Sequence, residues 1–299
     1  MFDWIIKKLK KNLRKFIVFS INCIILYHLH TDRHKSGKRI FFIVWEKIKK
    51  NSFYRQSFGF IDNPYRLDYL DFFYHRILIL FQKHHINFVP KITIQSNQKI
   101  NNLINLQESN IIVGIHDGFA FTTRLISEQT KSISAIALST RKTQSEGFKT
   151  TGVRAGVNVI EADRYSLVNV LSCFKSNHTL CSHVDFRFDT NEYVFISPAL
   201  FQLSIDNKIP LYFSNFKVND KGVINAYFKK SPNSKIAATI INEFIIFINE
   251  TSGYTRRFKI LKYQKNRSLK RRGAKAFINS CVKFINEVSA GAGLFKFSK

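Results

Sequence analysis

The sequence contains few cysteines, little acidic charge and none of the short motifs that mark the commonest enzyme sites. It has no P-loop, no Gly-x-Gly-x-x-Gly turn, no His-Glu-x-x-His pair and no Gly-x-Ser-x-Gly elbow, so nucleotide-driven chemistry, zinc hydrolysis and ordinary serine hydrolysis lose support. The cysteines are scattered, without a C-x-x-C pair and without histidine at metal-ligand spacing; they are Cys23, Cys173, Cys181 and Cys281. We therefore expect free thiols in a reducing compartment, no metal site and no cofactor.

Acidic residues number 20 against 47 lysines and arginines, which gives a net charge of +27. Such a field favours polyanionic partners: nucleic acid, an anionic membrane or an acidic carrier protein. Residues 1–55 hold 14 basic and three acidic residues, and residues 254–275 hold ten basic and no acidic ones. No helix-turn-helix, zinc-finger or ribonucleoprotein signature appears, and the basic residues flank apolar segments, so we predict no nucleic-acid partner. For residues 254–275 a solvated basic face remains the alternative.

No apolar run reaches the ~20 residues that a membrane span needs. The longest candidate near the start is Phe16 to Tyr27, which follows a basic, amphipathic stretch from Trp4 to Lys15. This order predicts a membrane-associating helix, with residues 1–30 as an interfacial or partly inserted anchor. A signal peptide is less favoured because no small-residue cleavage site follows, and a core helix beside a solvated basic one stays open.

Hydrophobic strands alternate with amphipathic helices through the middle of the chain. Helices of ten to fifteen residues between strands require crossover connections, so the fold class is α/β, with a central mixed, largely parallel sheet flanked by helices. We find no repeat and no Gly/Ser linker, and residues 31–299 are expected to form one domain. The expected strands are 111–115, 132–139, 157–161, 179–184, 210–218 and 222–229, the expected helices are 40–50, 65–84, 119–128, 165–176, 198–207 and 275–288, and 236–249 is helix or strand. Residues 93–110 and 140–156 are expected to be polar connections.

His116-Asp117-Gly118 ends the strand around which the other elements are arranged. In an open α/β sheet, ligands bind at the carboxyl ends of the strands. Two other strands bring polar residues to this edge: Glu161, Asp163 and Arg164 after one, and His183, Asp185 and Arg187 after the other. A histidine beside a carboxylate suits general-base catalysis, and the arginines suit an anionic group or a developing oxyanion. An ordinary turn with a structural histidine is the alternative.

The order of these elements resembles the bacterial late acyltransferases of lipid A biosynthesis, within the lysophospholipid acyltransferase-like superfamily. The similarity rests on the basic, apolar N-terminus, on IIVGIHDGF around His116, on the strand–helix–strand segment from Gly156 to Asp185, and on VFISPALFQLSIDNKIPLYFSNF from Val194 to Phe216. It covers roughly residues 1–230 and, more weakly, the C-terminal GLFKFSK.

The resemblance implies an O-acyltransferase without a cofactor. In the family, a histidine with an Asp or Glu five positions on deprotonates an acceptor hydroxyl, which attacks the thioester of acyl carrier protein or acyl-coenzyme A. His116 matches the base, but Phe121 stands at the acidic position, so Asp117 and Asp185 are the candidate acids. We expect Arg164, Arg187, His183 and Phe121 to bind substrate.

The implied acceptor is an anionic glycolipid, and the implied location is the cytoplasmic face of a bacterial inner membrane. The alternative function is a catalytically silent relative that binds lipid or a surface glycan precursor, which Phe121 favours.

Overall fold

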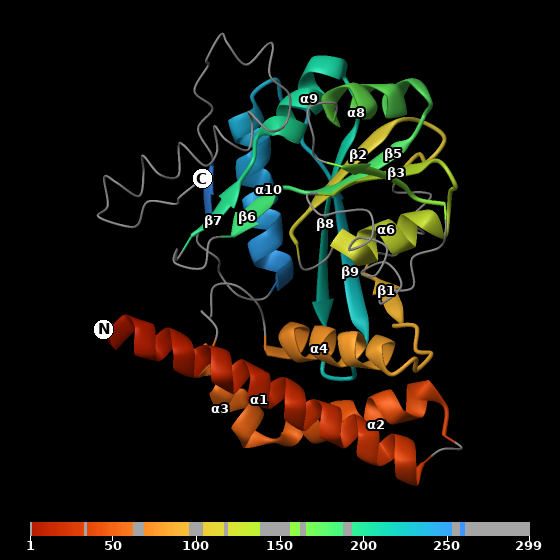
Figure 1. The fold of residues 1–299 in the computed structure, drawn as a ribbon. Coiled ribbons are helices and arrows are strands. Elements are labelled where there is room, and N and C mark those ends of the chain that lie inside the picture. Colours follow the sequence, from red (N-terminus) through yellow and green to blue (C-terminus); the bar gives the residue numbers. More distant parts are fainter. Residues whose placement is uncertain are drawn as a thin grey trace.

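The computed structural model of the 299-residue chain describes residues 2–32, 35–61, 69–95, 104–116, 119–137, 156–161, 166–187, 193–252 and 258–260. These residues form an N-terminal layer of helices below a sheet domain (Figure 1). The helices are α1 (Phe2–Thr31), α2 (Gly37–Lys50), α3 (Ser52–Ile61), α4 (Tyr69–Lys83), α6 (Phe119–Ser127), α8 (Ser166–Lys175), α9 (Ala199–Asn207) and α10 (Ala237–Ser252). The strands are β1 (Ile92–Ile94), β2 (Asn110–Gly114), β3 (Ile133–Ala137), β4 (Asn158–Glu161), β5 (Thr179–His183), β6 (Asp185–Arg187), β7 (Val194–Ile196), β8 (Leu211–Val218), β9 (Ile224–Lys230) and β10 (Phe258–Ile260).

The central sheet has seven strands in the order β1-β9-β8-β2-β5-β3-β4. Strands β8, β2, β5, β3 and β4 run parallel, β9 is antiparallel to β8, and β1 pairs with β9 in parallel. Strand β2 lies in the middle and is buried along its whole length, as its run of β-branched residues predicts. The predicted α/β class and mostly parallel sheet are therefore confirmed.

Three short strands form a second sheet in the order β10-β7-β6. The expected strand 179–184 is observed as β5, which ends one residue earlier, at His183. It was not predicted that Asp185 begins a further strand, β6, which pairs antiparallel with β7. The apolar pattern continues through Val184, so the sequence does not indicate that the chain passes from one sheet to the other at this residue. The backbone of Asp185 therefore pairs within the smaller sheet, while its side chain contacts His116, which follows β2 of the central sheet.

Two further differences concern short elements. Residues 92–94, taken mostly as polar connection, form the edge strand β1, because β9 offers it a partner that local sequence does not reveal. Residues 52–61 form α3, which the sequence analysis did not predict. Segment 237–252, left open between helix and strand, is the helix α10. The predicted helix at 275–288 lies outside the described residues.

The N-terminal region is a continuous 30-residue helix, α1, packed against α2, α3 and α4. Ile17, Ile21 and Ile25 are spaced by four residues, lie on one face and are fully buried. In the part of the chain that the structure describes, no helix is long and apolar enough to cross a membrane.

The helical layer meets the carboxyl edge of the central sheet. Strand β8 continues past the end of β2, and the turn that follows it contacts α2, where the indole of Trp45 donates to the carbonyl of Asp220 (3.2 Å). The carboxylate of Asp71, on α4, accepts the backbone N–H of Val218 at the end of β8 (2.8 Å). The edge predicted to carry the site therefore faces α1–α4.

Candidate functional site

A histidine and an aspartate meet where β2 and β5 end. His116 follows β2 by two residues, and its ring Nδ1 lies 3.0 Å from Oδ1 of Asp185. The same oxygen accepts the backbone N–H of His116 at 2.7 Å. The Asp185 side chain is 0% exposed, whereas the His116 side chain is 44% exposed. A buried carboxylate thus holds an imidazole that is open to a substrate.

The backbone around the pair fixes its geometry. The N–H of Val184 donates to the carbonyl of Gly114 (3.0 Å), and the carbonyl of Val184 accepts the N–H of Ser197 (2.8 Å). These bonds bind the link between β5 and β6 to β2 on one side and to the segment after β7 on the other. A Cβ at Gly114 would lie 2.8 Å from Oγ of Ser214, so a side chain there would push β8 away from β2.

His183 lies against the catalytic candidate. Its ring centroid is 3.5 Å from that of His116, with the planes at 45°. His183 is in register with Gly114 on the neighbouring strand, and it precedes Asp185 by two residues. One segment therefore contacts His116 twice, through a ring and through a carboxylate. We expected His183 to bind substrate. The structure brings its ring to the imidazole of His116, and its contact with substrate stays a prediction.

The hydrogen bonds assign the protonation of the neutral His116 ring. A carboxylate only accepts, so Nδ1 carries the hydrogen and donates to Asp185, and Nε2 keeps its lone pair. Among the described residues, nothing is hydrogen-bonded to Nε2. The ring is therefore oriented so that Nε2 is the nitrogen that could act as a base.

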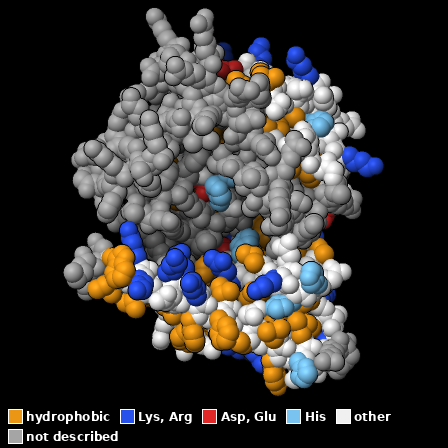
Figure 2. All heavy atoms as spheres, viewed as in Figure 1, with side chains coloured by type: hydrophobic (Ala, Val, Ile, Leu, Met, Phe, Trp, Pro, Cys, Tyr) orange, Lys and Arg blue, Asp and Glu red, His pale blue; other side chains and the backbone are white. Residues whose placement is uncertain are grey.

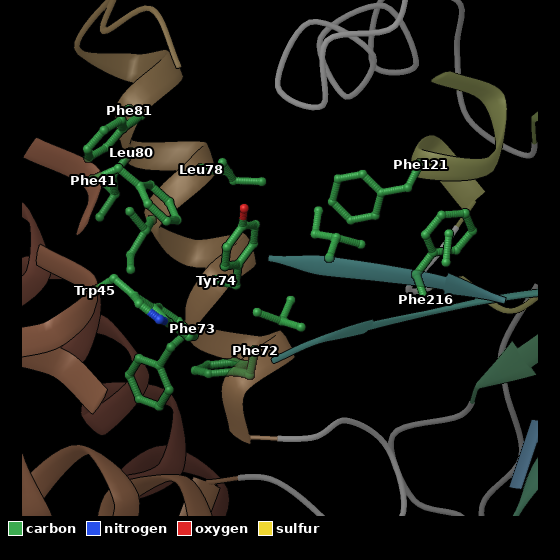
Figure 3. Close-up of a cluster of buried hydrophobic side chains, with 14 of the residues drawn as sticks. Phe41, Trp45, Phe72, Phe73, Tyr74, Leu78, Leu80, Phe81, Phe121 and Phe216 are labelled. Atoms are coloured by element: carbon green, nitrogen blue, oxygen red, sulfur yellow. The ribbon is translucent and has the colours of Figure 1, made fainter. Parts of the chain in front are cut away.

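Phe121 lies in the hydrophobic core. Its side chain is 1% exposed, and its ring centroid is 5.5 Å from that of His75 and 5.8 Å from that of Phe216. Figure 3 shows it on α6, opposite Tyr74 and Leu78 of α4. The ring packs between the helical layer and the sheet, so this position serves the core. Its predicted contact with substrate stays a prediction.

The remaining predicted residues are not all described. Asp117 and Arg164 lie outside the described residues, as does Asp163. Arg187 ends β6 in register with Val194, and Glu161 ends β4 in register with Ala137. The structure therefore brings together His116, Asp185 and His183. Of the two acids that the sequence left open, it places Asp185 on the imidazole.

A separate basic cavity of about 440 Å³ lies at the helical layer. Its lining residues are Lys49, Lys50, Asn51, Ser52, Arg55, Gln56 and Asp220. Neither His116 nor Asp185 lines it. Among the described residues, no group of three or more His, Cys, Asp or Glu side chains is placed to hold a metal ion.

No protein-family model matches the chain, and no curated protein matches its sequence.

Proposed function

We propose that the protein is a membrane-associated O-acyltransferase that transfers a fatty acyl chain from a thioester to a hydroxyl of an anionic glycolipid. The observation that supports this most is the half-exposed imidazole of His116 held by the buried carboxylate of Asp185. The resemblance to the lipid A late acyltransferases supplies the substrate classes. A location at the cytoplasmic face of a bacterial inner membrane belongs to the same proposal.

The chemistry follows from the orientation of the ring. Nε2 of His116 takes the proton of the acceptor hydroxyl as its oxygen attacks the thioester carbonyl. The Asp185 carboxylate stabilises the imidazolium that forms. When the tetrahedral intermediate collapses, the carbon–sulfur bond breaks and the imidazolium returns its proton to the leaving thiolate. The products are an ester and a free thiol, and the base is regenerated.

The carboxylate comes from a different element than the resemblance implies. The family's acid lies five positions after the histidine, on the helix that follows it, and here Phe121 stands there. Asp185, from the first residue of β6 in the three-stranded sheet, binds the same imidazole nitrogen that such an acid would have to orient. The departure at position 121 is therefore compatible with general-base catalysis.

The basic charge suits the proposed partners. An acyl carrier protein is acidic, and acyl-coenzyme A and a phosphorylated glycolipid are anionic, so a net charge of +27 steers each of them to the protein. Arg164 and Arg187 stay our predicted contacts for an anionic substrate group or for the oxyanion.

The test is consumption of thioester by the purified protein. Acyl-coenzyme A or acyl carrier protein thioester is mixed with a bacterial membrane lipid extract, free thiol is measured, and the acylated lipid is identified by mass spectrometry. His116→Ala should abolish both signals. His178→Ala is the matched control, because His178 lies just before β5 at the opposite edge and bonds Ser134 (2.9 Å).

The alternative is a catalytically silent lipid-binding relative, for which Phe121 is the argument. It predicts no thiol release from the folded wild-type protein, with retention of glycolipid unchanged by His116→Ala. Turnover that survives in His116→Ala would contradict both readings, since the site would lie elsewhere.

A further inference from the structure

Helix α1 carries a second apolar face on the side opposite to its buried one. Ile17, Ile21 and Ile25 point into the core. Apart from Trp4, the exposed apolar side chains of α1 are Ile5, Leu9, Phe16, Phe19, Cys23, Leu26 and Tyr27. Their spacings of three, four and seven residues place them along one side of the helix. Phe19 is 63% exposed, so this row, which we call the outer stripe, lies open along the helix.

Helix α3 widens the outer stripe. The exposed ring of Phe53 meets Phe16 edge to face, with centroids 6.0 Å apart. Phe60, at the other end of α3, is also exposed, and the ammonium of Lys10 lies 5.7 Å from its ring. The contact between Phe53 and Phe16 therefore places an exposed aromatic ring of α3 beside the outer stripe.

A row of lysines borders the outer stripe. Lys8, Lys11 and Lys15 are exposed and, at spacings of three and four, share one side of α1. The ammonium of Lys8 lies 4.8 Å from the ring of Trp4, an exposed indole at the start of the helix. In Figure 2 basic and hydrophobic side chains gather next to one another over the N-terminal helices. Aromatic rings beside lysines are typical of helices that lie in a membrane interface.

We propose that α1 and α3 dock flat on an anionic lipid bilayer through the outer stripe, with α1 parallel to the membrane plane. This deepens, and rests on, the proposed function, because it names the lipid class and the surface that meets it. Charge decides between the bilayer and a second copy of the chain. Two stripes facing each other would bring the lysine rows together and repel, whereas anionic headgroups attract them.

The packing of α1 gives its direction relative to the bilayer. A helix that crossed the membrane would expose apolar side chains all round, but one face of α1 is occupied by α2, α3 and α4. Only the outer stripe is left to enter lipid, and it runs along the helix. The same layer meets the carboxyl edge of the sheet through two hydrogen bonds, from Trp45 of α2 to the carbonyl of Asp220 and from the backbone N–H of Val218 to Asp71 of α4. Docking therefore holds the His116 edge of the sheet, rather than its amino edge, nearer to the membrane.

The first experiment measures sedimentation of the full-length protein with vesicles. We expect binding to phosphatidylglycerol–phosphatidylcholine vesicles, and weaker binding to pure phosphatidylcholine or at high salt. Phe16→Ser with Phe19→Ser should lower the partition coefficient at least about tenfold, because two phenyl groups no longer enter lipid. Leu167→Ser with Val168→Ser is the matched control, since these α8 residues are as exposed but lie outside the stripe. It should bind like wild type.

The second experiment measures depth by tryptophan fluorescence. The chain has two tryptophans, of which Trp4 is 63% exposed and Trp45 is 1% exposed. Vesicles should shift the Trp4 emission to the blue, and lipids brominated near the headgroup should quench it. Two variants that lack the native indole (Trp4→Phe) carry a new one at either end of the outer stripe, through Leu9→Trp or Tyr27→Trp, 18 positions and ~27 Å apart on the same side of α1. A flat helix requires the same bromine positions to quench at both ends.

Three outcomes would overturn the docking proposal. They are equal binding of the Phe16/Phe19 double variant and wild type, quenching at different depths for the two ends of α1, and loss of a dimer instead of vesicle binding in that variant. Acyl transfer to an acceptor dissolved in detergent is measured in parallel. It reports on His116 without vesicles, so failure of the docking proposal and failure of the transferase proposal are distinguishable.

Discussion

Replacing Asp185 by asparagine removes the charge behind His116 while keeping the shape of the side chain. In the wild type, one oxygen of Asp185 accepts both the ring Nδ1–H and the backbone N–H of His116. The amide oxygen of asparagine still accepts these hydrogens. It no longer stabilises an imidazolium, and its NH₂ group, if turned toward the ring, favours the tautomer with the hydrogen on Nε2. That tautomer has no base for the acceptor hydroxyl.

The size of the effect differs between activity and stability. Loss of the orienting acid in the Ser-His-Asp triad lowers kcat by about 10⁴, which corresponds to ~5.4 kcal/mol of transition-state free energy. We expect a loss approaching this in Asp185→Asn. The free energy of unfolding should fall by only about 1–2 kcal/mol, since both hydrogen bonds persist but become neutral. A large catalytic loss with a small loss of stability identifies a residue that acts through His116.

Three measurements check this: thiol release, urea unfolding and the ¹⁵N chemical shifts of the His116 ring, which report the tautomer. Asp71→Asn is the matched control, because Asp71 is also buried and accepts a backbone N–H, but lies on α4 away from any imidazole of the site. It should lose a similar amount of stability and keep its activity. If Asp185→Asn keeps more than about a tenth of the activity, the assignment of Asp185 is wrong.

Three further predictions concern buried side chains. Phe121→Asp restores the family's acid but replaces a core ring by an unpaired carboxylate. It should lower the free energy of unfolding, measured in urea, by about 3–5 kcal/mol without raising turnover. A stable and more active variant would contradict the placement of this ring. The hydroxyl of Tyr74 is buried without a hydrogen-bond partner among the described residues, so Tyr74→Phe should raise the free energy of unfolding by about 1 kcal/mol. Tyr54→Phe, the control, loses a 2.9 Å bond to Ser20 and should lower it. The same change in the free energy of unfolding in both variants would contradict this prediction. Burial raises the pKa of the Cys181 thiol, so at about pH 8.5 it stays protonated and should not react with a disulfide reagent until the protein unfolds. The exposed Cys23 should react at once. The assay uses Cys281→Ser, and rapid modification of Cys181 in the folded protein would contradict its burial in β5.

The sequence predicted the elements whose hydrophobic period is long and regular. Strand β2, strands β8 and β9 and the helices between the parallel strands follow from local pattern, because each buries a face that the pattern already marks. His116 could be singled out because it follows a buried strand. The choice of Asp185 over Asp117 could not be made, since it depends on which strand lies next to β2, and strand order is not encoded locally.

Features that depend on residues far apart in the chain could not be predicted from the local sequence pattern. The sheet switch at Val184 is decided by backbone bonds to Gly114 and Ser197, which lie far away in the chain. The stacking of His183 on His116 depends on the register between β5 and β2. The family-like spacing drew attention to position 121, whereas the side chain that reaches the imidazole lies 69 residues away from it in the chain.

His116 and Asp185 are positioned by two different sheets, so the proposed chemistry requires both sheets to be folded. His116 follows a strand of the seven-stranded sheet and Asp185 opens the three-stranded one, whose other strands come from residues 194–196 and 258–260. A chain in which only the larger sheet has formed would keep its imidazole but lose the anion that orients it. Loss of the three-stranded sheet alone should therefore abolish turnover while most of the ellipticity persists, so that catalysis would report whether this sheet is intact.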